Sequence, residues 1–378
     1  MAEGRPEKLH IVNLSHLAWE RKLFQRPQQL AAQFASLGDQ VHYFALVGLR
    51  RYLLMDLRER VYETDNLLAQ NLPFMPLAKR LGLSRAATMA LLRAKAAAPL
   101  RQAPAGRRVL WLQNPAYVDE VERLPHDLLV YDVMDPFAAF RTSDPRVKER
   151  EERLLARADI VFTGGRSLHS MVEEKRHDHI HCFPSGIDFD HFASAAGDGP
   201  IPEDLEKIPG PVLGYFGAVD ERIDWDLVQH VCRERRNWSI VFLGPLVLID
   251  EIPINEPNFH WLGPKSYGLL PKYLRGFDVC LIPWLVNDLT RFMSPTKTPE
   301  YLAAGRPVVS TPIPDVAQDY PGEAFIASTP KEFVEKCTTA LRQGIGAARK
   351  PPQSRTWKET AEDMRRLLLE RLEEKEGT

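Results

Sequence analysis

Twice along the chain, a short apolar run is followed by a polar loop, a helix pattern and further apolar runs. In the first half the runs cover residues 9–13 and 41–45, and a helix pattern begins between them at Pro27. In the second half a run at residues 211–217 begins a similar series, which continues at residues 239–243, 259–262, 279–282 and 308–310. Strand, crossover helix and strand in this order form a right-handed βαβ unit of an open parallel sheet. We therefore expect two doubly wound α/β domains, with ligands beyond the carboxyl ends of the strands.

The composition is that of an ordinary globular protein, with 44% hydrophobic and 26% charged residues in a length of 378. The 49 lysines and arginines nearly balance the 51 acidic residues, so bulk charge favours no nucleic-acid partner. The polar start predicts no signal peptide, and no apolar run approaches the roughly 20 residues of a membrane span. The four cysteines are isolated, which indicates a reducing compartment and no structural zinc. We expect a cytoplasmic protein with neither a metal nor a cofactor.

Two stretches indicate domain boundaries. Residues 193–211 are small, polar and proline-containing, as in an interdomain linker. After Pro352 an amphipathic helix is expected, with these apolar positions on one face: Trp357, Ala361, Met364, Leu367, Leu368 and Leu372. We expect domains at residues 1–193 and 194–355, followed by a separate helix at residues 356–378.

Residues 294–311, S-P-T-K-T-P-E-Y-L-A-A-G-R-P-V-V-S-T, predict a loop, a short helix, a turn and a buried strand. A hydroxyl residue before a proline can begin the helix, at residues 294–295 or 298–299. Gly305 ends it, because a left-handed residue after a helix favours the absence of Cβ. The N–H groups of the helix start and the Lys297 ammonium form an anion site that suits phosphate. Glu300, one turn further on, can accept two ribose hydroxyls; the alternative is a solvated lysine and glutamate on an ordinary helix.

The pattern P-x-K-x-x-E-Y-[LM]-A-x-G-x-P-V-V in this stretch resembles the nucleotide-sugar signature of family 4-type retaining glycosyltransferases, also called group 1, which have the GT-B fold. The resemblance implies that Glu300 holds the ribose and that the preceding residues hold the diphosphate. Those residues are Ser294, Pro295, Thr296 and Lys297. The usual second glutamate, eight positions earlier, is Phe292 here, and polysaccharide-building members often lack it too. The expected fold is two Rossmann-like domains facing across a cleft, with the terminal helix packed back on the first, acceptor-binding domain.

In the first half, the loop of residues 15–26 follows a strand and therefore lies at the ligand end of the sheet. It resembles the W…Q-R-P loop of related polysaccharide glycosyltransferases, which makes His16, Glu20 and Arg26 site candidates, although each can equally be a rim residue. The next candidate follows the strand at residues 128–131. We favour Asp135 there as a contact to donor or acceptor hydroxyls, because Asp132 is closer to the strand body.

In the second half, Gly214 and Gly217 lie in a strand–loop–helix unit and let the backbone approach a ligand closely. The resemblance places a basic residue for the diphosphate in the loop after them, and Arg222 matches it. A second arginine that some members carry after the glycine is Ala218 here. Further along, relatives hold the nucleobase largely by backbone, which makes Gly263 and Lys265 candidates for that contact.

Asn287 and Thr290 precede the signature in a run that resembles the P-f-x-x-N…S-P-x-K pattern of sugar-polymer transferases. They can contact the donor sugar in place of the missing glutamate. The alternative is that both side chains form loop-stabilising hydrogen bonds.

Residues 77–108 are rich in lysine and arginine and contain no acidic residue. Leucines and alanines alternate with the cations, as in a basic amphipathic helix. One hypothesis is peripheral contact with anionic lipids on the inner face of the membrane. The alternative is a helix that covers the first sheet and has a solvated basic face.

These patterns predict transfer of a sugar from a nucleotide-diphospho-sugar donor to a hydroxyl acceptor, which is a glycan, a polysaccharide or a lipid-linked sugar. Arg222, Lys297 and Asp135 are the expected catalytic residues, and the resemblance implies retention of configuration without a metal. Two alternatives stay open. One is a nucleotide-sugar 2-epimerase of related fold, and the other is a non-catalytic nucleotide-sugar-binding scaffold.

Overall fold

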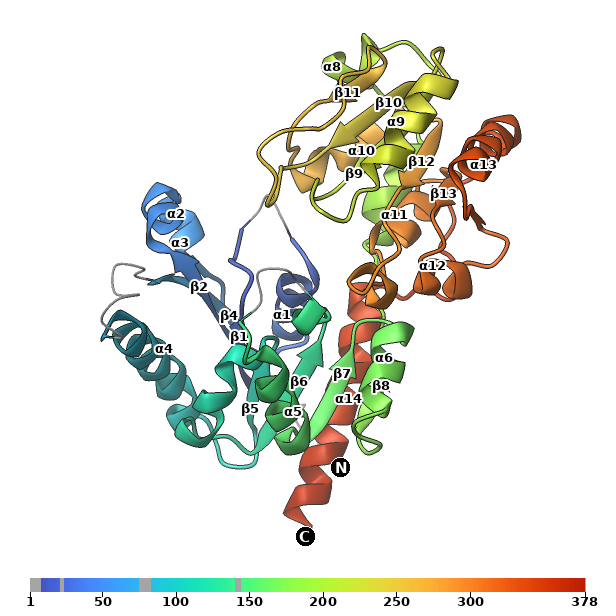
Figure 1. Cartoon of the computed structure of the whole chain (residues 1–378). Helices are drawn as coiled ribbons and strands as arrows, with labels where there is room; N and C mark the ends of the chain where they lie inside the picture. The colour runs from blue at the N-terminus through green and yellow to red at the C-terminus, as the bar shows by residue number, and fades with distance from the viewer. Residues whose placement is uncertain (1–7, 21–23, 75–82, 140–143, 378) are drawn as a thin grey trace. The chain divides into compact units, whose positions relative to one another are not determined.

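The chain forms two units, each built around its own parallel sheet (Figure 1). The structure is a computed structural model, and it describes residues 8–20, 24–74, 83–139 and 144–377. The first unit contains residues 1–164, 168–184 and 357–378, and the second contains residues 165–167 and 185–356. The predicted pair of parallel α/β sheets is confirmed.

The first unit has an eight-stranded sheet in the order β3-β4-β2-β1-β5-β6-β7-β8. Neighbouring strands pair in parallel, except that β3 is antiparallel to β4. Strands β1, β5 and β6 are almost wholly buried, as parallel strands covered on both faces are. The strands are β1 (His10–Ser15), β2 (Gln40–Gly48), β3 (Val61–Glu63), β4 (Leu67–Phe74), β5 (Arg108–Leu112), β6 (Leu128–Val133), β7 (Ile160–Thr163) and β8 (Ile180–Cys182).

Helices fill the connections between these strands. The predicted helix at Pro27 begins at Arg26, and it buries Leu30 and Phe34 against the sheet as the sequence pattern indicates. The helical segments are α1 (Arg26–Ser36), α2 (Leu49–Leu54), α3 (Leu57–Arg60), α4 (Leu83–Gln102), η2 (Pro115–Arg123), η3 (Phe137–Ala139), α5 (Val147–Arg157) and α6 (Arg166–Glu173). None of the helices in the described ranges combines the length and the apolar character that crossing a bilayer needs.

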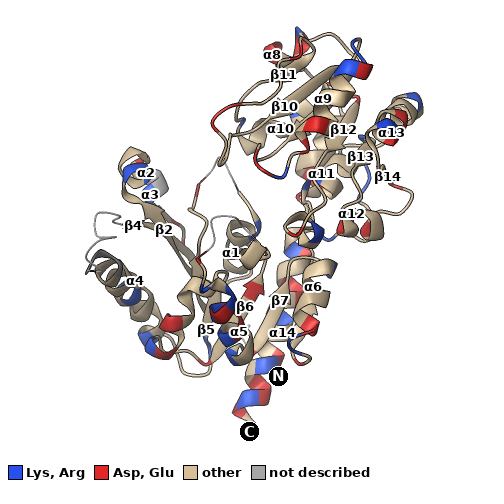
Figure 2. Ribbon diagram, in the orientation of Figure 1, with Lys and Arg blue, Asp and Glu red and all other residues tan. Residues whose placement is uncertain are grey.

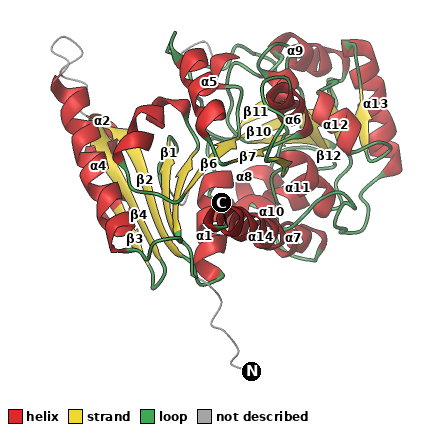
Figure 3. Cartoon of the chain, turned by 90° about the horizontal axis from the view of Figure 1, so that it is seen from below, coloured by secondary structure: helices red, strands yellow, loops and turns green. Residues whose placement is uncertain are grey.

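The terminal helix α14 (Trp357–Glu376) packs against α1 in the first unit (Figures 1 and 3). Its apolar face joins the core of that unit through Trp357, Ala361, Met364, Leu368 and Leu372. Charged residues follow the rest of the helix, as Figure 2 shows. Arg365 on α14 pairs at 2.8 Å with Asp39, which is fully buried. The predicted return of the terminal helix to the first domain is thus confirmed.

The second unit has a six-stranded, wholly parallel sheet in the order β11-β10-β9-β12-β13-β14. Its strands are β9 (Val212–Phe216), β10 (Ser239–Leu243), β11 (Phe259–Trp261), β12 (Val279–Ile282), β13 (Val308–Ser310) and β14 (Ala324–Ile326). Its helical segments are α7 (Phe189–Ala193), η4 (Ser194–Ala196), α8 (Glu203–Glu206), α9 (Trp225–Glu234), η5 (Tyr267–Leu269), α10 (Leu270–Arg275), η6 (Thr290–Phe292), α11 (Lys297–Ala303), α12 (Pro314–Asp319) and α13 (Pro330–Gln343). The order of its central strands, β10-β9-β12, reverses direction at β9, which is the kind of position where open sheets bind ligands.

Candidate functional site

The short helix α11 begins at Lys297, between the two starts that the sequence offered. A side-chain cap was expected, but Thr296 at the N-cap position makes no such hydrogen bond. The physical reason is that the Pro295 carbonyl already accepts the Thr298 N–H at 3.1 Å, so a backbone turn leads into the helix. Pro299 falls within the first turn, where a proline needs no N–H partner. The expected start of the helix is therefore corrected to Lys297.

The end of α11 is as predicted. Gly305 has a φ of +70° and follows the C-cap. Its N–H donates to the Leu302 carbonyl, and the Arg306 N–H donates to the Tyr301 carbonyl, both at 3.0 Å. This pair of bonds is a Schellman motif, which requires a left-handed residue at that position. The turn leads the chain directly into β13.

The Lys297 side chain is 9% exposed and lies among aromatic rings and glycine backbone. Its Nζ is 5.1 Å from the centre of the Trp284 ring and 5.5 Å from that of Tyr215. Gly217, with a φ of +140°, lies directly against the lysine, so that an added Cβ would be 2.2 Å from Lys297 Cε. The close backbone approach predicted at Gly217 is therefore made to the lysine. At Gly214 that expectation is corrected, because the space a Cβ would take is filled by the core ring of Phe277.

Arg222 lies against the same tryptophan. Its guanidinium carbon is 4.8 Å from the centre of the Trp284 ring. Its Nε donates to the Asp220 carboxylate at 2.9 Å and its Nη2 donates at 2.5 Å, which orients the guanidinium in one plane. The structure thus brings the two predicted diphosphate cations, Arg222 and Lys297, to one ring. Two positive charges held together at low exposure are suited to bind a diphosphate.

Burial shifts the titration of the two charged groups of α11 in opposite directions. It lowers the pKa of Lys297 because the ammonium loses hydration, and the nearby Arg222 charge lowers this pKa further. Burial raises the pKa of Glu300, and the Asp188 carboxylate acts in the same direction. The lysine and the glutamate each counteract the shift of the other. Perturbed titratable groups of this kind concentrate at functional sites.

The side chains of Asn287 and Thr290 stabilise their own loop. The Asn287 Oδ1 accepts the N–H groups of Leu289 and Thr290 at 3.0 and 3.1 Å. The Thr290 hydroxyl is fully buried and donates to the Leu285 carbonyl. These contacts are the loop-stabilising bonds of the alternative interpretation. Asn287 itself is exposed.

The two residues predicted near the nucleobase, Gly263 and Lys265, follow strand β11. Gly263 has a φ of +70°, and its carbonyl accepts the Gly244 N–H at 3.0 Å. Lys265 donates to the Asp204 carboxylate at 2.6 Å and lies over the Tyr273 ring. The open space beside the Gly263 Cα fits a contact made by backbone. Lys265 is engaged by protein groups, so its part in a base site would require that ion pair to open.

In the first unit, His16 is half-buried after β1 and packs edge-on against Phe137. Desolvation lowers the pKa of His16 to about 4, so the imidazole is neutral at physiological pH. Its Nδ1 has no hydrogen-bond partner among the described residues. Glu20 pairs at 2.7 Å with Arg51, which is largely exposed. His16 therefore keeps a buried polar atom for a ligand, whereas Glu20 is part of an ion pair.

Arg26 and Asp135, the other two candidates of this unit, have different surroundings. The Arg26 guanidinium is 3% exposed, donates twice to Asp132 at 2.7 and 3.0 Å, and donates to the Phe183 carbonyl at 2.7 Å. These contacts give Arg26 a structural role. Asp135 follows β6 and is half-buried. Asp132 is bound by Arg26, and Asp135 lies two positions beyond the end of β6.

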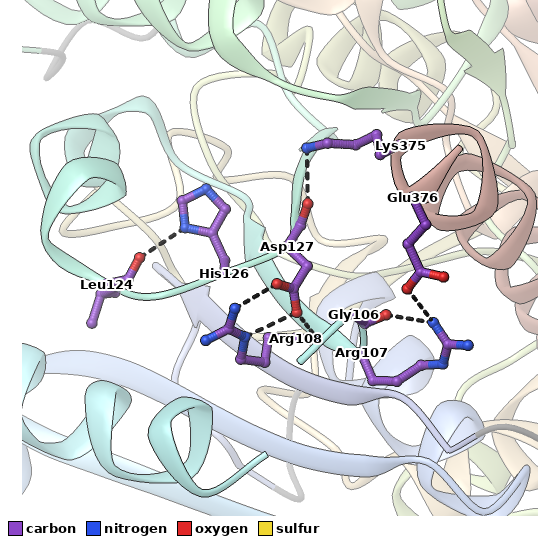
Figure 4. A network of polar contacts seen from close by, with 8 residues as sticks. All are labelled: Gly106, Arg107, Arg108, Leu124, His126, Asp127, Lys375 and Glu376. Atoms are coloured by element: carbon purple, nitrogen blue, oxygen red, sulfur yellow. Dashed lines mark hydrogen bonds and ion pairs between the residues drawn. The ribbon is translucent and has the colours of Figure 1, made fainter. Parts of the chain in front are cut away.

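The basic region at residues 77–108 contains α4, and its residues 77–82 lie outside the described part of the chain. Helix α4 packs on β1, β2 and β4 through Leu92, Ala96, Ala97 and Leu100. Arg93 pairs with Glu120 at 2.7 Å. Figure 4 shows two more cations of the basic region in ion pairs, Arg107 with Glu376 and Arg108 with Asp127. Lys95 and Arg101 are exposed. The packing of α4 is that of a helix that covers the sheet, as the alternative interpretation expected.

Two residues of the site escaped the sequence analysis. Asp220 orients Arg222, and Trp284 lies against both cations. The sequence held a signal for each: an acidic residue two positions before the arginine, and an aromatic residue directly after a buried strand. Among the described residues, no group of three or more histidine, cysteine, aspartate or glutamate side chains is arranged to hold a metal ion.

Comparison with known proteins finds a family model that matches part of the chain and solved structures that share its fold. Residues 210–343 match the model of a family described as glycosyl transferases group 1. Over 258 residues the chain is 26% identical to TuaH of Bacillus subtilis (strain 168), which is named as a teichuronic acid biosynthesis glycosyltransferase. That alignment covers 63% of this chain, and it spans 64% of the length of TuaH.

Two solved structures resemble nearly the whole chain. Sucrose-phosphate synthase from Thermosynechococcus elongatus has a TM-score of 0.68 at 13% identity, with 97% of this chain and 94% of that chain covered. HepE from Anabaena, solved in complex with UDP and glucose, has a TM-score of 0.65 at 12% identity, with 95% and 99% covered. At such low identity the likeness shows the fold alone, and the predicted GT-B fold is confirmed.

Proposed function

Because residues 210–343 match the model of the group 1 glycosyl transferases and the chain has the GT-B fold, we propose that it transfers a sugar from a nucleotide-diphospho-sugar to a hydroxyl acceptor. The observation that carries this proposal is the meeting of Arg222 and Lys297 at the Trp284 ring. Paired cations of low exposure on or near the helix that carries the half-buried Glu300 match a charged leaving group that is attached to a ribose.

The two cations act on the bond that breaks. As the anomeric C–O bond lengthens, negative charge grows on the diphosphate, and Arg222 and Lys297 stabilise that charge. Backbone N–H groups in the segment from Ser294 to Thr296 add to the same effect. Glu300 accepts hydrogen bonds from the ribose hydroxyls. Its distance of one helical turn from Lys297 lets one helix bind both parts of the nucleotide.

Groups of the first unit act on the sugar and the acceptor. Asp135 orients a hydroxyl at the reacting face, and the unpartnered Nδ1 of His16 contacts the donor sugar or the acceptor. We infer retention of configuration and independence from metal ions from the family resemblance. Product analysis of the anomeric linkage and assays with a chelator test these two points.

Relatives suggest where to begin the search for substrates. HepE was solved with UDP and glucose, and a trehalose-6-phosphate protein of this fold from E. coli was solved with UDP-2-fluoro glucose. TuaH is named for teichuronic acid biosynthesis, which favours an acceptor that is a growing polysaccharide or a lipid-linked sugar. We propose a UDP-sugar donor and a sugar hydroxyl as acceptor.

Incubation with a panel of UDP-, GDP- and dTDP-sugars, with and without oligosaccharide acceptors, tests the reaction type. Release of free nucleotide that an acceptor stimulates supports a transferase. A changed sugar on an intact nucleotide means that the chain is an epimerase, and binding without turnover means that it is a scaffold. A thermal-shift screen identifies the donor first, since a ligand at 100 times its Kd adds about 2.7 kcal/mol of stability.

Peripheral contact with anionic lipids through residues 77–108 would rest, among the described residues, on the exposed Lys95 and Arg101. Sedimentation with anionic vesicles at low salt tests this contact. Replacement of both cations by glutamine should then return the protein to the supernatant. Equal recovery of the wild type with and without vesicles removes membrane contact from the proposal.

A further inference from the structure

We infer that Trp284 is the positioning residue of the diphosphate site, and that its ring holds Arg222 and Lys297 side by side for one ligand. This inference rests on the proposed function and adds a residue to it. The ring centre lies 4.8 Å from the Arg222 guanidinium carbon and 5.1 Å from Lys297 Nζ. A cation within about 6 Å of a tryptophan ring is attracted by the negative potential of the ring face.

Burial strengthens this attraction. Trp284 is 2% exposed, and Lys297 is 9% exposed. Cation–π attraction increases when water is excluded from both partners. The neighbouring Tyr215 ring, which is fully buried, has its centre 5.5 Å from the Lys297 Nζ. Two aromatic rings therefore lie beside the lysine ammonium, and none of the described carboxylates forms an ion pair with it.

The backbone fixes the ring relative to Arg222. Ile223 and Trp284 form an antiparallel bridge. On either side of it, the Asp224 N–H donates to the Pro283 carbonyl at 2.8 Å, and the Leu285 N–H donates to the Arg222 carbonyl at 2.7 Å. The loop that carries the arginine and the segment that carries the tryptophan are thus joined by backbone hydrogen bonds. The Trp284 carbonyl also accepts a hydrogen bond from the Thr311 hydroxyl at 2.6 Å, which ties the segment that carries the tryptophan to the end of β13.

The two cations need such a support because they repel each other. Arg222 is one of the causes that lower the pKa of Lys297, which shows that the two charges interact. Asp220 binds the arginine directly, whereas Asp220 and Glu300 act on the Lys297 charge only through longer-range electrostatics. The face of Trp284 offsets the repulsion without adding a negative charge that would repel a diphosphate. Loss of the ring should therefore weaken the binding of a charged diphosphate and leave the binding of an uncharged nucleoside unchanged.

Calorimetric titration with UDP and with uridine, or with the diphosphate and nucleoside of whichever base binds, tests this inference. In Trp284→Leu we expect the affinity for the diphosphate to fall about tenfold or more, since one ring supports two cations, while the affinity for the nucleoside stays unchanged. Trp284→Phe keeps a smaller aromatic face and should recover most of the loss. Trp238→Leu is the matched control. It removes a buried tryptophan that lies against Arg235 in the same unit, and it should change neither affinity.

A second measurement avoids any change of volume. Replacement of all tryptophans by 5-fluorotryptophan withdraws electrons from the rings and weakens cation–π attraction. We expect it to lower the diphosphate affinity of the wild type and to leave that of Trp284→Phe unchanged. Equal losses for diphosphate and nucleoside in Trp284→Leu, or no effect of fluorination on the wild type, would overturn the inference while the proposed function stands. A wild type that binds no nucleoside diphosphate would overturn the proposed function, and the inference with it.

Discussion

The side chain of Lys297 lies on the backbone of Gly217, where an added Cβ would be 2.2 Å from the lysine Cε and 2.7 Å from its Nζ. Gly217 has a φ of +140°, which residues with a side chain rarely adopt. The glycine that ends β9 therefore makes room for the cation that begins α11. Two segments 80 positions apart form one wall of the site.

Gly217→Ala should displace the Lys297 ammonium and weaken nucleoside diphosphate binding by about tenfold or more, and it should also cost roughly 1–3 kcal/mol of stability through backbone strain. Calorimetric titration and urea unfolding measure the two effects. Gly322→Ala is the matched control, because its φ is +74° and no atom lies within 4 Å of the added Cβ. Equal diphosphate affinity in the two variants would contradict the displacement of the lysine.

Arg222→Ala and Lys297→Ala should each reduce turnover by about 10²-fold or more, because each removes a positive charge from the developing diphosphate. Both variants should remain folded, as circular dichroism can establish. Initial rates with saturating donor separate a loss of catalysis from a loss of binding. Folded variants with wild-type rates would remove both residues from the mechanism.

The affinity for a nucleoside diphosphate should have a bell-shaped pH dependence. As pH rises, Lys297 loses its proton earlier than an ordinary lysine does, since burial lowers its pKa, and the diphosphate is released. As pH falls, Glu300 gains a proton earlier than an ordinary glutamate does, since burial raises its pKa, and the ribose contact weakens. Arg222, Asp220 and Asp188 are the other charges that act on this pair.

Two variants separate the limbs of that profile. Lys297→Arg stays charged at all accessible pH values and should flatten the alkaline limb. Glu300→Gln cannot titrate and should flatten the acidic limb. Titration of the ligand's own phosphate is common to all three proteins, so it cancels in the comparison. An alkaline limb that persists in Lys297→Arg would show that another group causes it.

Arg26→Met should destabilise the first unit by roughly 3–5 kcal/mol, because it leaves Asp132 buried and without its cation. The double variant Arg26→Met, Asp132→Leu should recover much of that loss, since no lone charge then remains. Urea unfolding of the three proteins measures the effect. A single variant that keeps wild-type stability but loses activity would instead place Arg26 among the ligand contacts.

Leu368→Ala on α14 should cost about 2–5 kcal/mol, because the leucine is fully buried where the helix meets the core of the first unit. Arg366→Ala, on the exposed face of the same helix, should change stability by less than about 0.5 kcal/mol. Thermal unfolding compares them. Similar losses of stability in both variants would mean that the charged residues of α14 stabilise the first unit as much as its apolar face does.

Much of the sheet pattern was predictable because each strand is a local apolar run. Strands β1, β9 and β13 lie where the sequence placed them, and Gly305 ends α11 as its position indicated. Strand β14 was missed because a three-residue strand that is only partly buried carries almost no pattern. The start of α11 was misplaced because two hydroxyl–proline pairs competed for it, and a backbone turn rather than a cap decided between them.

By itself the sequence determined which groups are candidates for the chemistry and where the chain turns, because these depend on residue type and on near neighbours. Only the tertiary structure decided what those groups contact. The sequence made Arg26 a ligand candidate, and only the fold revealed its pairing with Asp132, 106 positions away. Trp284 gained a role only when the fold placed both cations on its ring. Packing, and the cost of burying a charge without a partner, decide which residues distant in sequence pair with each other. A local sequence pattern reveals neither of these two factors.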